Sequence, residues 1–172
     1  MRPRHPVRLA TFDYRGPHQY FLTFCVDGRR HAFVQPAAVA LVRSHFLRVA
    51  AEQEFAVIAY CFMPDHVHLL IEGLAPRSDA RVFITQAKQR AGFHYRQTFG
   101  ERLWQRYAYD HVLRRDEATF GVARYILENP VRAGLVERPA DYPFSGSTLY
   151  SVEELCEAIQ MMPVWQRFRG DE

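Results

Sequence analysis

The stretch "YCFMPDHVHLLIEG", residues 60–73, decides the fold. It contains the end of one apolar segment, a short Met-Pro-Asp turn and a second apolar segment. We therefore predict a β-hairpin whose strands cover 55–62 and 66–73. Side chains alternate along a strand, so His66 and His68 share one face while Val67 points into the core. Such a strand ordinarily carries Thr or Lys at these positions. The histidine pair indicates either a functional site or two histidines that bind no ligand.

The segments on either side of this hairpin predict a regular alternation of strands and helices. Aromatic and β-branched residues predict a strand at 18–26, and 103–114 is a further strand or a loop leading into one. Apolar periodicity and caps predict helices at 36–53, 78–100, 116–130 and 151–160. The order is βαββαβ followed by a further helix.

This order predicts an α+β fold, a ferredoxin-like (RRM-like) antiparallel sheet with helices on one face. The first and third strands are central, and a C-terminal helix and tail follow. We expect one domain over 1–172, with a basic arm at 1–15 and a tail at 150–172.

The composition is that of a folded protein, with 48% hydrophobic and 24% charged residues. Cys25, Cys61 and Cys156 are odd in number and far apart, which argues against a disulfide framework and for a reducing cytoplasm. We expect neither a secretory signal nor a membrane span. The net charge is +3, and Lys88 is the only lysine. Arginine suits phosphate contacts, although a coding bias toward Arg accounts for the composition equally well.

The histidine pair is compatible with a divalent cation, because neutral imidazoles on one face can converge on one ion. Two histidines without a ligand are an equally good interpretation of this motif alone. A metal needs further ligands, and the candidates are Asp65, Glu72, His111 and the polar end of the third helix. There, Tyr125 and Asn129 lie four residues apart and share a helical face. A tyrosine in such a helix is more often a packing residue than a nucleophile.

Four blocks of the sequence point further when they are taken together. They are "MPDHVHLLI", "LWQRYAYDHVLRR", "YILENPVRAGLV" and "DYPFSGS", and they span most of residues 15–148. In content and order they resemble the REP-associated tyrosine transposases of the single-tyrosine HUH transposase superfamily.

The resemblance implies a site and a reaction. His66 and His68 match the metal-binding pair, Tyr125 matches the nucleophile, and Asn129 matches the third ligand, where many relatives carry Gln. The ion would be Mg²⁺ or Mn²⁺. Tyr125 would cleave single-stranded DNA beside hairpins (REP-type palindromes) through a 5′-phosphotyrosine intermediate. The resemblance also implies a bacterial cytoplasmic protein, nucleoid-associated when bound to DNA, as a monomer or homodimer.

Basic and aromatic residues around this region are candidates for DNA contact. They are Lys88, Arg90, Trp104, Arg106, Tyr107, Arg114 and Arg115. Two other functions remain open. One is a noncatalytic nucleic-acid-binding module on an RRM-like sheet. The other is a zinc hydrolase, for which His111 is the best third ligand. Tyr107 and Tyr109 are weaker candidates than Tyr125 for the nucleophile.

Overall fold

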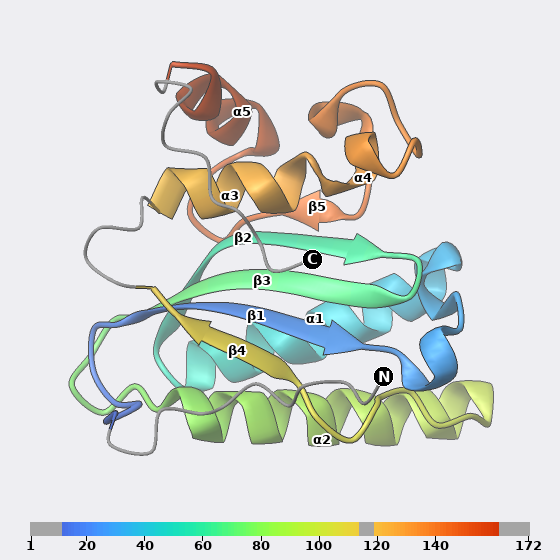
Figure 1. The fold of residues 1–172 in the computed structure, drawn as a ribbon. Coiled ribbons are helices and arrows are strands. Elements are labelled where there is room, and N and C mark those ends of the chain that lie inside the picture. The colour runs from blue at the N-terminus through green and yellow to red at the C-terminus, as the bar shows by residue number, and fades with distance from the viewer. Residues whose placement is uncertain (1–11, 114–118, 162–172) are drawn as a thin grey trace, which may run out of the picture.

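The computed structural model describes residues 12–113 and 119–161, and its first four strands and two helices follow the predicted order (Figure 1). In the first half these elements are β1 (Gln19–Cys25), α1 (Pro36–Glu52), β2 (Phe55–Met63), β3 (His66–Gly73) and α2 (Ala80–Phe99). They are followed by β4 (Tyr109–Val112), α3 (Thr119–Leu127), α4 (Asn129–Arg132), β5 (Ser145–Gly146) and α5 (Val152–Gln160). The α+β class is confirmed. No helix in these two ranges is long and apolar enough to cross a membrane.

The strands form one antiparallel sheet in the order β4-β1-β3-β2-β5. β1 and β3 lie inside the sheet as predicted, so the histidine strand has a neighbour on each side. In the described part of the predicted segment 103–114, residues 109–112 form a strand. Most of the part before it is a loop, in which Trp104 bridges to Val26, the residue that follows β1.

The strand β5 was not predicted, because two residues are too few to show a period. It pairs with Tyr60 and Cys61 of β2. Gly146 permits this approach, since a Cβ there would lie 2.3 Å from the hydroxyl oxygen of Tyr60. Glycine is therefore required where β5 crosses the ring.

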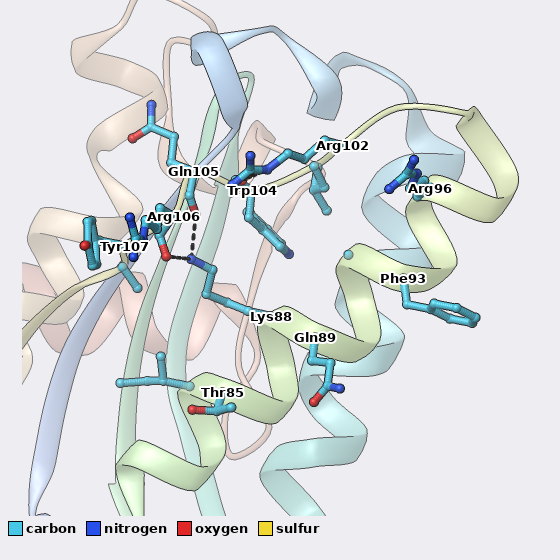
Figure 2. Close-up of a pocket in the computed structure, with 14 residues that line it drawn as sticks. Thr85, Lys88, Gln89, Phe93, Arg96, Arg102, Trp104, Gln105, Arg106 and Tyr107 are labelled. Atoms are coloured by element: carbon cyan, nitrogen blue, oxygen red, sulfur yellow. Dashed lines mark hydrogen bonds between the residues drawn. The ribbon is translucent and has the colours of Figure 1, made fainter.

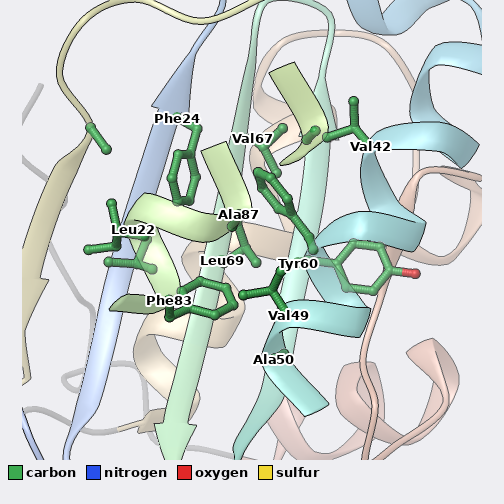
Figure 3. Packing of buried hydrophobic residues seen from close by; sticks show 14 of the residues in the cluster. Leu22, Phe24, Val42, Val49, Ala50, Tyr60, Val67, Leu69, Phe83 and Ala87 are labelled. Atoms are coloured by element: carbon green, nitrogen blue, oxygen red, sulfur yellow. The ribbon is translucent and has the colours of Figure 1, made fainter. Parts of the chain in front are cut away.

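The sheet separates two apolar layers. α1 and α2 cover one face, where strand residues such as Leu22 and Leu69 pack with Phe83 of α2 (Figure 3). α3 and α5 lie over the other face, where Leu70 packs with Ile126 (Figure 1). The pleat of β3 sends Val67 to the first layer, as predicted, and His66 and His68 to the side of α3.

Local signals in the sequence set the ends of the helices. The Asp79 side chain accepts hydrogen bonds from the backbone N–H groups of Arg81 and Val82, and α2 ends at Gly100 with φ 77°. The α3 helix ends at Leu127, one turn earlier than the predicted 130, and the chain resumes as α4 with Pro130 in its first turn. The predicted start of this helix at Asp116 lies outside the described residues. The C-terminal helix α5 begins with a capping box of Ser151 and Glu154.

A candidate metal and tyrosine site

Four predicted site residues line one cavity of about 380 Å³ between the sheet and the end of α3. His66 and His68 come from β3, Tyr125 from α3 and Asn129 from the first turn of α4. The complete lining is Phe21, Thr23, Arg29, His66, His68, Tyr109, Tyr125 and Asn129. The fold thus places side chains that are far apart in the sequence around one space.

Hydrogen bonds fix both imidazoles. Nδ1 of His66 lies 2.6 Å from Oδ1 of Asp65, and Nδ1 of His68 lies 2.9 Å from Oγ1 of Thr23. A carboxylate only accepts, so His66 donates its Nδ1–H and its Nε2 carries the lone pair. This is the way a metal-binding histidine is commonly oriented by a second group.

The two Nε2 atoms face each other at 3.0 Å. Because the Nε2 of His66 carries the lone pair, this separation is that of a hydrogen bond donated by the Nε2–H of His68. The Nδ1 of His68 then accepts from the hydroxyl of Thr23. The two Nε2 atoms lie close enough together to bind one ion once His68 takes its other tautomer, and the side chain of Asn129 lines the same cavity.

Burial lowers the pKa of both histidines. For His66 the hydrogen bond and charge of Asp65 oppose this effect. For His68, which is 6% exposed, the pKa lies well below 6.5 because of burial first and then the charges of His66, Arg132 and Arg29. A lowered pKa keeps both imidazoles neutral near neutral pH, and the neutral imidazole is the form that can bind a metal ion.

The buried state of His68 predicts a pH dependence of stability. Below pH 6.5 the unfolded chain takes up a proton at this position while the folded chain stays neutral, so acid favours unfolding. We expect the stability advantage of the wild type over His68→Gln to shrink as the pH falls from 7.5 to 5. Urea melts of both proteins in EDTA measure it, and an advantage that grows with acid would contradict this account.

The ring of Tyr125 packs beside the histidine pair. Its centroid lies 5.8 Å from those of both His68 and Phe21, in edge-on contacts. Tyr109 of β4 lines the same cavity and is the alternative phenol there. Tyr107 lies elsewhere, on the groove described below, and is 54% exposed.

The other candidate third ligands do not join the pair. Asp65 accepts a hydrogen bond from Nδ1 of His66, on the side of the ring opposite the Nε2 that faces His68. His111 pairs with Phe21 across β1 and β4, but it is not part of the cavity lining. Glu72 lies four residues beyond His68, about 13 Å along the strand. Among the described residues, no three His, Cys, Asp or Glu side chains gather as a metal site.

Several predicted DNA-contact residues lie on a different surface. Lys88, Trp104, Arg106 and Tyr107 line a groove of about 780 Å³ between α2 and the segment 102–108. Figure 2 shows Lys88 reaching across it to the backbone oxygens of Gln105 and Arg106, at 2.7 and 3.1 Å. Trp104 is only 6% exposed and packs among core phenylalanines.

The remaining predicted contacts are not part of this groove. Arg90 pairs with Glu52 of α1 at 2.6 Å and is not in the groove lining. Arg114 and Arg115 lie outside the described residues.

Sequence reasoning missed residues at both surfaces. The groove lining also includes Arg96 and Arg102, contains no carboxylate, and has Phe93 59% exposed at its edge. At the cavity it missed Thr23 and Arg29, whose Nε lies 2.8 Å from Oδ2 of Asp65. Arg29 has φ 55°, which is unusual for a residue other than glycine, but no sequence pattern revealed that conformation.

Comparison with known proteins defines the class and then the family. The fold is that of a solved REP-associated tyrosine transposase bound to a REP hairpin, with a TM-score of 0.69 and 21% identity over 95% of this chain and 92% of that one. A family model for IS200-like transposases matches residues 16–126. This chain belongs to the IS200-like transposase family, and it is a DNA-processing enzyme by that membership.

Two further proteins are similar to this chain. It is 29% identical over 146 residues to a Haemophilus influenzae protein described as a REP-associated tyrosine transposase, covering 77% of this chain and 81% of that protein. A solved structure described as a transposase of Deinococcus radiodurans has a TM-score of 0.50 and 20% identity, over 71% of this chain and 95% of that one. The resemblance predicted from the sequence is confirmed.

Proposed function

We propose that this protein is a metal-dependent endonuclease and strand transferase that cuts single-stranded DNA beside hairpins through Tyr125. The observation that carries the proposal is the shared cavity of Tyr125, His66, His68 and Asn129. A phenol, two neutral imidazoles and an amide side chain around one space suit attack on a phosphate. The family membership supports DNA as the substrate.

The ion would be held by His66, His68 and Asn129. When bound, Mg²⁺ or Mn²⁺ supplies a Lewis acid that neutralises charge on the scissile phosphate. Mixed nitrogen and oxygen ligands favour Mn²⁺. Asp65 holds the His66 imidazole with the lone pair on Nε2, the nitrogen that would bind the ion, and Thr23 orients the ring of His68.

Tyr125 would carry the covalent step. Its phenolic oxygen attacks phosphorus in line, the bond from phosphorus to the 3′-oxygen breaks, and the phenolic proton is lost as the 3′-OH forms. The product is a 5′-phosphotyrosine, which conserves a phosphodiester. A 3′-OH of another strand can therefore reverse the step and join the strands without ATP.

Two features support single-stranded DNA with a hairpin as the substrate. The solved relative is bound to a REP hairpin. In this chain the groove beside α2 brings four basic side chains together with exposed Phe93 and Tyr107. Cations that follow a phosphate backbone and aromatic rings that stack on bases are the usual means of holding a single strand.

The test of the function is incubation with end-labelled single-stranded DNA carrying a REP-type hairpin, with Mg²⁺ or Mn²⁺. We expect a covalent protein–DNA adduct that survives a denaturing gel and is lost in EDTA. The matched substrate is the same sequence as a full duplex, which we expect not to react. Binding of the hairpin without any adduct would instead identify a noncatalytic binding module.

The groove predicts a salt-dependent effect on affinity. Replacing Arg96 and Arg106 together by Ala should weaken hairpin DNA binding whatever its sequence, because both would contact phosphates. The slope of the logarithm of the binding constant against the logarithm of the salt concentration should become less steep by about 1.4. This is the change expected when two phosphate contacts with a single strand are lost. Fluorescence anisotropy at several salt concentrations measures it.

Arg77→Ala is the matched control, because Arg77 is an exposed arginine paired with Glu54 before the N-terminus of α2. We expect its slope to equal that of the wild type. An unchanged slope in the double variant would remove the groove from the DNA-binding surface.

A further inference from the structure

Arg132 makes three contacts around the proposed nucleophile. The carbon of its guanidinium lies 4.4 Å from the centroid of the Tyr125 ring, and its Nη2 donates to the backbone oxygen of Tyr125 at 2.6 Å. Its Nη1 lies 3.6 Å from Oε2 of Glu128. One side chain therefore holds both the ring and the backbone of the same tyrosine.

The break between α3 and α4 produces this arrangement. Pro130 has no N–H, and it lies in the first turn of α4 after α3 has ended at Leu127. The chain stays close to helical geometry through the break, since Glu128 has φ −78° and ψ −8°. Seven residues are nearly two turns, so Arg132 returns to the side of Tyr125. Its planar fork can then reach the ring, the carbonyl and Glu128 together.

The ring of Tyr125 is thereby enclosed on several sides. Phe21 and His68 contact it edge-on from the sheet, and Arg132 covers a ring face. A cation over an aromatic face is attracted to it, and the carbonyl contact limits movement of the backbone. Without Arg132 the ring would keep its packing on the sheet but lose the group that covers its face.

We propose that Arg132 is a positioning residue that holds the Tyr125 ring in its orientation for attack. The inference rests on the nucleophilic role proposed above for Tyr125. A small misplacement of a reacting group costs far more in rate than in binding. Arg132 therefore controls the rate of the covalent step and leaves DNA affinity to other residues.

The test separates the rate of the covalent step from affinity. Under single-turnover conditions with hairpin DNA and Mn²⁺, we expect Arg132→Gln to form the adduct about 10- to 100-fold more slowly. Its dissociation constant for the same DNA should stay within about twofold of the wild type, as should that of the control Arg138→Gln. Arg138 is exposed and pairs with Asp141, so this control removes one positive charge away from Tyr125.

Arg132→Lys is the second variant. It keeps a cation for the ring but lacks the fork, so we expect a rate between those of Arg132→Gln and the wild type. If Arg132→Gln is too unstable to assay, the lysine variant decides, and a wild-type rate in it would overturn the proposal.

Three results would contradict the positioning role. They are a wild-type rate in Arg132→Gln, a loss of affinity that accounts for the loss of rate, or an equal loss of rate in Arg138→Gln. Tyr125→Phe is assayed in parallel. If that variant is inactive while Arg132→Gln reacts normally, only this inference fails. If Tyr125→Phe still forms adducts, the proposed function fails first.

Discussion

Tyr125→Phe should abolish the covalent protein–DNA adduct while hairpin DNA still binds. The substitution removes one oxygen atom, and the ring keeps its contacts with Phe21, His68 and Arg132. Because the phenolic oxygen is the proposed nucleophile, we expect the cleavage rate to fall by roughly a thousandfold or more. Adduct formation on a denaturing gel and anisotropy with the same labelled DNA measure the two properties separately.

Tyr109→Phe is the matched control for this prediction. Tyr109 lines the same cavity from β4 and offers the same chemical group, so its substitution removes an equivalent oxygen from the same space. We expect this variant to keep most of its cleavage activity. If Tyr109→Phe were inactive and Tyr125→Phe active, the nucleophile would have to be reassigned to β4.

His66→Ala and His68→Ala should each lower the cleavage rate by roughly a hundredfold or more. Loss of a group that only hydrogen-bonds to a metal ligand already lowers metal affinity or activity 10- to 100-fold, and these two histidines are the proposed ligands themselves. Added Mn²⁺ should not restore full activity, because a higher concentration of the ion does not replace the missing ligand nitrogen. Cleavage rates over a titration of Mn²⁺ measure the effect, and isothermal titration of Mn²⁺ should show weaker binding.

His111→Ala provides the control for the histidine pair. His111 lies on the same sheet, paired with Phe21, but outside the cavity lining. It should behave as the wild type in both the cleavage and the metal titration. Wild-type cleavage in either His66→Ala or His68→Ala would remove the metal role from the pair.

Much of the fold could be predicted from local patterns. The alternation in β3 correctly separates Val67 from the histidines. The α2 helix begins after Asp79, whose side chain caps it, and ends before Gly100, which adopts a left-handed backbone conformation. Pro130 explains why the α3 helix stops early. The strand β5 escaped prediction because its stability comes from pairing with β2 and from the close approach at Gly146, which are tertiary effects.

The site was harder to predict than the fold. Strand periodicity placed His66 and His68 on one face, and helical periodicity placed Tyr125 near Asn129, but neither could bring the strand and the helix together. The family resemblance supplied that connection, and the structure brings all four to one cavity. Arg29 and Arg132 reach the site through a turn and a helix break, so their roles depend on backbone geometry that residue patterns do not encode.

The proposed DNA surface shows the same limit. The sequence put basic and aromatic residues of 88–115 in one cluster, yet the fold divides the described ones between the groove, the core and an ion pair with Glu52 of α1. Trp104 became part of the core because the segment 102–108 folds back onto β1. Arg96 and Phe93 entered the groove because α2 presents them beside that segment.

The most direct test of the central claim is to identify the residue that carries the DNA. The adduct with hairpin single-stranded DNA is digested with nuclease and protease, and mass spectrometry locates the nucleotide on the peptides. The account predicts a 5′-phosphodiester linkage on Tyr125. A linkage on Tyr109, Tyr107 or any other residue, or cleavage without any covalent product, would contradict it.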